Sequence, residues 1–269
     1  RIVGSGPFVV ASEVLGKEVT LKARNDYAWG PAKLDHQGRA RLDEIKIIVT
    51  PEDSVRIGAL LSNQAGFIRQ IQAYDEQRVT DRKFPVYAAS TRGVNDSLAF
   101  RPDNERVADV RVRKALLHAT NAKEIVQTLF TANYPQAKGV IVSTAAGFVD
   151  LSAELAFDEA KAKALLDEAG WVPQADGIRA KDGLPLVLST YESLNYLQNR
   201  EVLQLVAQQW AKVGVKLNVL SGDLGSKTID SLDPEKTALI PAMVGRADPD
   251  VIKSCLLYTS DAADEGLGV

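Results

Sequence analysis

Residues 184–219, LPLVLSTYESLNYLQNREVLQLVAQQWAKVGVKLNV, contain the pattern that decides the fold. The stretch opens with an apolar run typical of a buried strand, and it closes with alternating apolar and polar residues over 215–219. Between these two runs, apolar residues recur at helical spacing from about residue 199 to 213, and Gly214 ends that helix. The stretch therefore predicts a βαβ unit, with a right-handed crossover if the two strands are parallel neighbours in one sheet.

Ahead of this unit, the first fifty residues have the pattern of β-structure. Residues 19–23 alternate between apolar and polar side chains, and residues 45–49 have apolar residues at every second position, which predicts two strands. The connection between them includes RNDYAWGPAKLD, and its Asn, Gly and Pro residues are typical of turns. Pro51 and Asp53 then open a short predicted helix.

The middle of the chain is predicted to be helical, and its helices carry recognisable end signals. Asp109 is the expected N-cap of one helix, and Asn121 with Glu124 forms a capping-box arrangement at the start of the next. Asp158 caps a third helix, which Gly170 can end in the left-handed conformation. A last apolar run, ALIPAMVG, predicts a strand that leads into the loop GRADPD. The fold class is therefore α/β, or α+β at the front.

The composition is ordinary for a soluble globular protein of 269 residues, with 45% apolar and 25% charged residues and a net charge of −3. The sequence has no apolar run long enough for a membrane span and no Lys/Arg stripe with interleaved aromatics, so nucleic acid is not an expected partner. His36, His118 and Cys255 cannot form a disulfide or a metal site of recognisable spacing. No nucleophile elbow, phosphate loop or dinucleotide fingerprint occurs, so neither catalysis nor a cofactor is expected.

Four stretches in a fixed order carry a resemblance to a known family. They are GSGPFVV with LKARNDYAWG, then DVRVRKALLHATNAKEIV, then AFDEAKAKALLDEAGW, and last the DPD loop after a strand. Over residues 1 to about 253 they resemble the extracellular solute-binding proteins of family 5, the oligopeptide, dipeptide and nickel group that serves ABC importers.

The resemblance implies a bilobal fold like that of the type II periplasmic binding proteins, in which two α/β lobes close on a ligand. It also implies a function without chemistry, because the ligand shifts an open–closed equilibrium that a membrane permease reads. We therefore expect a monomeric substrate-binding component that captures a peptide-like or other small polar organic solute. Its expected place is periplasmic or extracellular, with a lipid anchor as one form. The alternatives are a bilobal ligand-sensing domain of a regulator and, less favoured, an α/β enzyme.

The same resemblance predicts how the chain divides. Residues 1–50 would be part of the first lobe near the hinge, and residues 51–254 would form the later lobe with the βαβ unit. The first third to half of the full-length protein, with its secretory signal, would lie outside this chain, so its own ligand affinity would be negligible. For residues 255–269 we hypothesise a non-native tail, since one frame of a transposase-based sequencing adapter encodes CLLYTSDAADE. The alternative is a genuine, divergent C-terminus.

Arg246 is the main candidate for a ligand contact. In peptide-binding members of the family, an aspartate near this loop meets the ligand's amine, whereas this chain offers Gly245 and Arg246. A guanidinium in a dry cleft favours a carboxylate or phosphate. The alternative is that Arg246 pairs with Asp248 or Asp250 to stiffen the loop. Asp248, Pro249 and Asp250 themselves are expected to be structural turn residues.

Three further residues are candidate ligand contacts. Tyr191 and Asn195 lie just beyond the carboxyl end of a predicted strand, where open α/β sheets place ligand contacts. Trp29 could stack on a ligand. The alternatives are a half-buried cover on the core for Tyr191 and packing for Trp29. For Trp171 and Trp210 we expect core positions, and for His118 a structural role.

Overall fold

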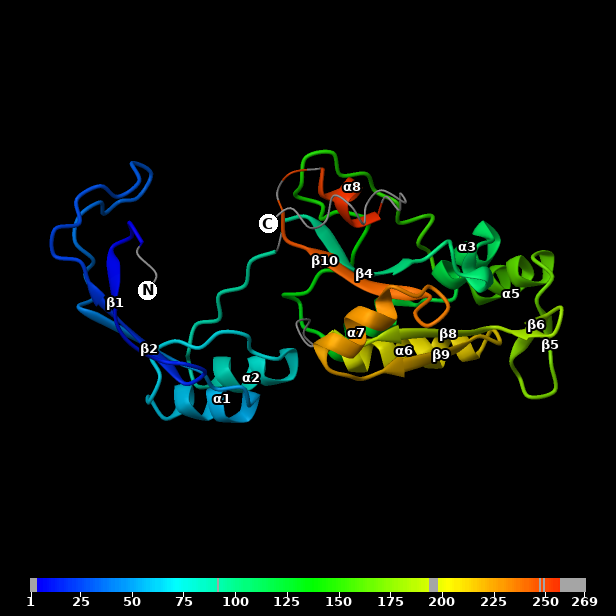
Figure 1. The fold of residues 1–269 in the computed structure, drawn as a ribbon, viewed down its shortest axis with the longest axis horizontal. Helices are drawn as coiled ribbons and strands as arrows, with labels where there is room; N and C mark the ends of the chain where they lie inside the picture. The colour runs from blue at the N-terminus through cyan, green and yellow to red at the C-terminus, as the bar shows by residue number, and fades with distance from the viewer. Residues whose placement is uncertain (1–3, 91, 194–197, 247, 249, 257–269) are drawn as a thin grey trace. The chain divides into compact units, whose positions relative to one another are not determined.

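The computed structural model describes residues 4–90, 92–193, 198–246, 248 and 250–256 (Figure 1). The described residues form two compact units. The first unit runs to Ile71 and includes residues 81–83, and the second contains residues 72–80 and the described chain from Phe84 onward. The lobe boundary predicted at residue 50 concerns the complete protein and stays a prediction.

The first unit is built on an antiparallel sheet in the order β1-β2-β3, followed by one helix. Each strand presents an apolar residue to its neighbour in the register Val10–Leu21–Ile45, which lines up one apolar face. The two strands predicted here are confirmed, and β1 adds a third. The elements are β1 (Phe8–Val14), β2 (Glu18–Ala23), β3 (Glu44–Ile48) and α1 (Asp53–Leu61).

The second unit mixes helices with short sheets, in agreement with the predicted α/β class. Its helical elements are α2 (Ala73–Asp81), η1 (Glu105–Val107), α3 (Val110–His118), α4 (Ala122–Leu129), α5 (Glu159–Glu168), α6 (Asn199–Ala211), α7 (Leu224–Ser231) and α8 (Val251–Leu256). Its strands are β4 (Val94–Phe100), β5 (Val172–Pro173), β6 (Arg179–Lys181), β7 (Leu184–Pro185), β8 (Val187–Tyr191), β9 (Lys216–Leu220) and β10 (Leu239–Val244).

The predicted βαβ unit is confirmed as β8, α6 and β9. The two strands are parallel neighbours, with Val187 opposite Lys216 and Tyr191 opposite Leu220. The predicted first strand is divided, because β7 pairs with β6 whereas β8 pairs with β9. Helix α6 lies along this pair and buries an apolar face that includes Trp210 (Figure 1).

Strand β10 connects the βαβ unit to a strand from much earlier in the chain. The Ala238 N–H donates to the Ser189 carbonyl at 3.1 Å, and the Thr190 hydroxyl donates to the Leu239 carbonyl at 3.0 Å, so β10 begins beside β8. It then pairs antiparallel with β4, Leu239 opposite Phe100. The main apolar core lies beneath these elements and the helices α3 to α6, and a smaller cluster of Val94, Ile141 and Val251 lies near the end of β10. The most buried large side chains of the main core include Val107, Val112, Leu116, Leu166, Leu186, Leu188, Val213, Val215 and Leu239.

The predicted helix caps are present. The side chains of Asp109, Asn121 and Asp158 accept hydrogen bonds from backbone N–H groups at the starts of α3, α4 and α5. The capping box of α4 is only half formed, because the Glu124 carboxylate accepts a bond from Gln209 Nε2 at 3.1 Å instead of reaching back to the cap. Neighbouring residues therefore determine where these helices start, whereas the second bond of the capping box is replaced by the tertiary contact between Glu124 and Gln209.

The expected buried residues of the second unit are found in its interior. Trp171 and Trp210 are 3% and 2% exposed, and both belong to the main core. His118 is buried as well, with Nδ1 at 2.7 Å from the Ala156 carbonyl oxygen. The structural role predicted for this histidine is confirmed.

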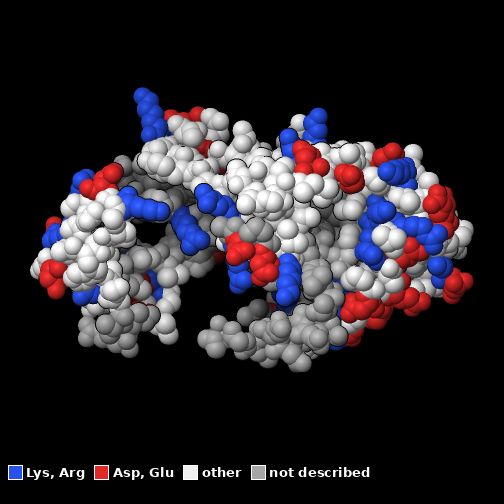
Figure 2. Space-filling model, turned by 90° about the horizontal axis from the view of Figure 1, so that it is seen from above, with Lys and Arg blue, Asp and Glu red and all other residues white. Residues whose placement is uncertain are grey.

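The outer surface of the second unit carries both signs of charge. On the face shown in Figure 2, lysine and arginine side chains are interspersed with aspartate and glutamate over the right-hand part of the view, which is the second unit. Such mixing agrees with the net charge of −3. It gives this face no extended field of a single sign.

Candidate functional site

A ligand contact is predicted for Tyr191 at the carboxyl end of β8, and in the structure this side chain makes a hydrogen bond within the second unit. Tyr191 is the last residue of β8 and is only 8% exposed. Its hydroxyl donates to the Asp230 carboxylate at 2.7 Å, and Lys236 Nζ lies 2.9 Å from the other oxygen of that carboxylate. The hydrogen bond to Asp230 raises the pKa of Tyr191 and lowers the pKa of Asp230. The Tyr191 hydroxyl is therefore already engaged within the second unit.

The loop that follows β8 is held by an ion pair. Glu192 accepts two hydrogen bonds from Arg200, each 2.6 Å long, and this pairing holds the pKa of the Glu192 carboxyl below its usual range. The backbone N–H of Ser193 donates to the Asn199 side chain at 2.7 Å. The loop start is thus tied to the first turn of α6. Asn195, also predicted as a contact, lies outside the described residues.

Arg246 and Gly245 follow directly after β10, and both are exposed. Among the described residues, no ion pair joins Arg246 to Asp248 or Asp250. The Asp248 side chain instead accepts from the Asp250 N–H at 3.0 Å, and its carbonyl accepts from Val251 at the start of α8 at 3.1 Å. These bonds bring Asp248 against the start of α8, and its role as a structural turn residue stays a prediction.

Pro249, the third predicted turn residue, lies outside the described residues. The two bonds that Asp248 accepts, from Asp250 and from Val251, turn the chain into α8.

Tyr191 and Arg246 are not brought together. β10 begins beside Thr190 and runs for six residues before Arg246 follows. A strand of that length spans roughly 17–20 Å. The two predicted contacts therefore lie at opposite ends of β10.

Trp29 belongs to the first unit, where local contacts fix its ring. Its Nε1 donates to the Ser5 carbonyl at 2.8 Å, and the Tyr27 ring centre lies 4.9 Å from its own. The Arg24 guanidinium lies 5.9 Å from the ring centroid, within the range of a cation–π contact. The Trp29 residue remains 52% exposed, so part of it is available for further contacts.

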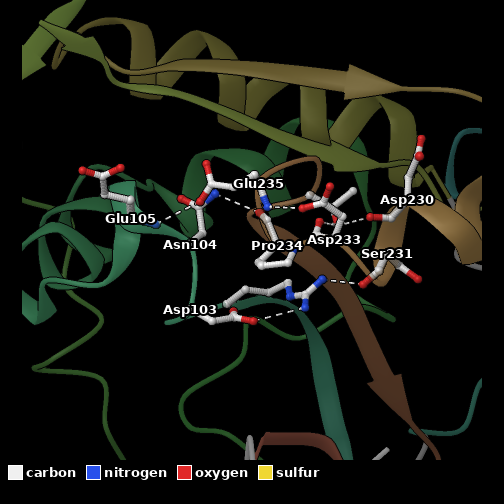
Figure 3. A network of polar contacts seen from close by, with 10 residues as sticks. Asp103, Asn104, Glu105, Asp230, Ser231, Asp233, Pro234 and Glu235 are labelled. Atoms are coloured by element: carbon white, nitrogen blue, oxygen red, sulfur yellow. Dashed lines mark hydrogen bonds and ion pairs between the residues drawn. The ribbon is translucent and has the colours of Figure 1, made fainter. Parts of the chain in front are cut away.

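The start of β10 is held in place by the loop after β4, and Figure 3 shows this network. Asn104 Nδ2 donates to the Pro234 carbonyl at 2.8 Å, and the Glu105 N–H donates to the Glu235 carboxylate at 3.2 Å. Arg101 adds a bond to the carbonyl at the end of α7. These bonds fix the segment between α7 and β10, and hence the strand that carries Arg246.

Two residues beside this strand were not predicted. Asp96 on β4 has an exposed side chain, yet the atoms packed around its carboxyl group remove enough water to raise its pKa to about 6, against an opposing hydrogen bond from the Ser97 backbone. Gly93, just before β4, lies against the backbone of Arg246. The positive φ of Gly93 cannot be predicted from the sequence. The environment of Asp96 depends on residues distant in the sequence, so no local pattern indicates its raised pKa.

The described residues contain no candidate metal site, because no group of three or more His, Cys, Asp or Glu side chains among them could hold a metal ion. Within the same residues, none of the helices has the length and apolar character needed to cross a membrane.

A family model and curated relatives match almost the whole of this chain. The family model for bacterial extracellular solute-binding proteins, family 5 (middle region), matches residues 1–262. The dipeptide-binding protein of Escherichia coli K12 is 25% identical over 266 residues, which are 98% of this chain and 46% of the relative. Heme-binding protein A of Haemophilus influenzae is 26% identical over 270 residues, covering 99% of this chain and 46% of the relative. The chain thus spans about half the length of these curated relatives.

Solved structures show the fold. NikA from Brucella suis, in complex with Fe(III)-EDTA, superposes with a TM-score of 0.78 at 24% identity, over 98% of this chain and 53% of NikA. Lactococcal OppA, complexed with an endogenous peptide, gives a TM-score of 0.73 at 19% identity, over 96% of this chain and 52% of OppA. Almost the whole chain therefore has a fold that corresponds to about half of a type II periplasmic binding protein, as the family resemblance implied.

Proposed function

Because the chain belongs to the bacterial extracellular solute-binding proteins of family 5, we propose that it is part of the substrate-binding component of an ABC importer. In this proposal two lobes close on a solute, and a permease in the membrane reads the closed form. The protein acts as a monomer in the periplasm or outside the cell, soluble or held by a lipid anchor. It performs no chemistry on the solute and binds no nucleic acid.

The ligand class we propose is a peptide-like or other small polar organic solute that carries an anionic group. The relatives support this class through the compounds in their names: a dipeptide, heme, a peptide and Fe(III)-EDTA. Dipeptides, heme and EDTA all carry carboxylates. A guanidinium pairs with a carboxylate through two parallel hydrogen bonds, which gives both affinity and orientation.

Arg246 is the residue we propose for that contact. The observation that carries the proposal is its exposed position beyond the end of β10, with Asp248 satisfied by Asp250 and Val251 and not by the guanidinium. Gly245 next to it would let the ligand approach the backbone closely.

Three more contacts remain part of the proposal with narrower roles. Trp29 would offer the exposed part of its ring for stacking. Tyr191 would contact a solute only through the small exposed part of its side chain, since its hydroxyl donates to Asp230. Asn195 would contribute from the loop after β8.

The test uses the full-length protein with the dipeptide Ala-Ala and with its C-terminal amide, measured by calorimetric titration. Arg246→Ala should weaken Ala-Ala binding by at least tenfold, because the carboxylate loses its charged partner. Arg246→Lys should recover part of the loss, and binding of the amide should change little in either variant. Equal affinities of the wild type and Arg246→Ala for Ala-Ala would refute the proposed contact.

A second measurement addresses the function as a whole. A thermal-shift screen of the 269-residue chain should show no ligand-induced rise, because the other part of the cleft is proposed to lie outside it. The genes beside the source gene separate import from regulation: permease and ATPase genes support an importer. A DNA-binding segment upstream in the same reading frame would favour a sensor domain, and turnover of a bound solute by the full-length protein would favour an enzyme.

A further inference from the structure

Gly93 lies immediately before β4, where the end of β10 passes. Its φ is +130°, a conformation that side chains other than hydrogen rarely allow. A Cβ at this position would lie 2.0 Å from the Val244 carbonyl oxygen and 2.8 Å from both the backbone nitrogen and the backbone oxygen of Arg246. All three are backbone atoms, so they cannot swing aside as the end of a long side chain can. Glycine is therefore required here for two independent reasons.

The other side of Gly93 is braced as well. Its carbonyl accepts a hydrogen bond from the Val142 N–H at 2.9 Å. The neighbouring Asn95 is fixed by two bonds to the same segment, to the Val140 carbonyl at 3.1 Å through its backbone and to the Gly139 carbonyl at 2.8 Å through its side chain. The steric clash of a side chain at position 93 could not be relieved by moving residue 93 away from β10 without breaking these bonds. The end of β10 would therefore have to move instead.

We infer that Gly93 is the positioning residue for Arg246: the space left by its missing side chain holds the backbone of Arg246 at the end of β10. Gly93 has no side chain with which to touch a solute, so it acts only through the residue it places. The consequence for ligand binding rests on the function proposed above. The placement itself does not, because it follows from the backbone contacts at Gly93.

Hydrogen exchange of the 269-residue chain tests the placement directly. In Gly93→Ala, the amides of the peptide that spans β10 and Arg246 should exchange roughly tenfold faster or more, since the strand end can no longer pack against β4. Gly147→Ala is the matched control, because Gly147 also has a positive φ of +81° but has nothing within 4 Å of the added Cβ. It should leave exchange in that peptide unchanged. A folded Gly93→Ala with wild-type exchange, or an equal increase in Gly147→Ala, would overturn the inference.

A milder variant covers the case in which Gly93→Ala does not fold. Asn95→Ala removes the side-chain bond to Gly139 without adding any atom, which loosens the brace behind Gly93. It should raise exchange in the same β10 peptide by a smaller factor, and no change there would count against the inference.

Ligand affinity then tests whether Gly93 acts through Arg246. In the full-length protein, with Ala-Ala as the probe, Gly93→Ala should weaken binding, but adding it to Arg246→Ala should cost little more. Full additivity of the two losses would overturn the inference. If Arg246→Ala alone leaves affinity unchanged, the proposed ligand contact fails, while the exchange experiment still decides the role of Gly93.

Discussion

Glu76 on α2 accepts a hydrogen bond from the hydroxyl of Thr131 at 2.6 Å, although the two residues are 55 positions apart in the sequence. The same carboxylate oxygen accepts a second bond from Asn133 Nδ2 at 2.8 Å, and the Glu76 residue is only 8% exposed. Desolvation, followed by the charge of Glu76, raises the pKa of the nearby Tyr134. A buried carboxylate with two neutral donors therefore anchors α2 to the segment after α4.

Removing this anchor should destabilise the second unit. Glu76→Ala removes a charged acceptor from the half-buried Thr131 hydroxyl and the exposed Asn133 amide, so we expect a loss of about 2 kcal/mol in the free energy of unfolding. Glu76→Gln should cost less, since its amide oxygen can still accept one bond. Urea unfolding followed by the fluorescence of the buried Trp171 and Trp210 measures both. Glu154→Gln, at an exposed carboxylate, is the control, and an equal loss in all variants would contradict the assignment.

Arg179 should be far more important for stability than the acid with which it pairs. Its side chain is buried, and it donates to the Val213 carbonyl at 2.8 Å and to the Trp171 carbonyl at 2.6 Å. We expect Arg179→Leu to cost about 3 kcal/mol, because these carbonyls lose their donors. The paired Asp167 is 60% exposed, so Asp167→Asn should cost less than about 1 kcal/mol. The same urea titration compares them, and similar losses would show that the ion pair carries the effect.

Asp109 should stabilise α3 both as a cap and as a charge. Hydrogen bonds from the Arg111 side chain and backbone lower the pKa of Asp109 to about 2, from 3.8. Since the folded-state value is the lower one, this contribution is present above about pH 4 and is lost as the pH falls through 2. Asp109→Ala should cost about 1 kcal/mol at pH 7.

The conservative variant separates the two contributions of Asp109. Asp109→Asn keeps a side-chain oxygen for the cap but has no charge to titrate. Its free energy of unfolding should therefore fall less steeply than that of the wild type between pH 4 and 2. Parallel acid limbs of the two proteins would exclude the charge effect.

Asp96 should have the opposite pH dependence. Burial raises its pKa to about 6, above the ordinary 3.8, so the folded state holds a proton that the unfolded state releases. Stability then decreases as the pH rises from about 4 through 6. Because the Asp96 side chain is exposed and therefore screened by solvent, Asp96→Asn should be more stable than the wild type at pH 7 by about 1 kcal/mol or less, and equal to it at pH 4. Thermal unfolding at both pH values checks this, and the same difference at both would refute it.

The features predicted from the sequence are those that neighbouring residues determine. Asp109 and Asp158 cap their helices because the cap and its N–H partner lie within three residues. The βαβ unit was predictable because its two apolar runs and the helix between them are contiguous.

The features that escaped prediction depend on partners far away in the sequence. The pairing of β4 with β10 and the acceptors of the Glu76 network are chosen by tertiary packing, which leaves no local pattern. The hydroxyl of Tyr191 illustrates the same limit, because its bond to Asp230 spans 39 residues. At the candidate site, a pattern could suggest Arg246, whereas the close approach at Gly93 could be recognised only from the backbone.

The pairing of β4 with β10 also determines when, during translation, β4 can find its partner strand. Ser97 on β4 donates to the Ala242 carbonyl of β10, and 145 positions separate them. At about 5–20 residues per second, a ribosome needs roughly 7–30 s to supply the partner strand. During that interval β4 is a nascent strand with an open edge, the kind of edge that recruits foreign strands. Native pairing of β4 therefore waits until β10 has been translated, and a holding chaperone could protect the open edge before that moment.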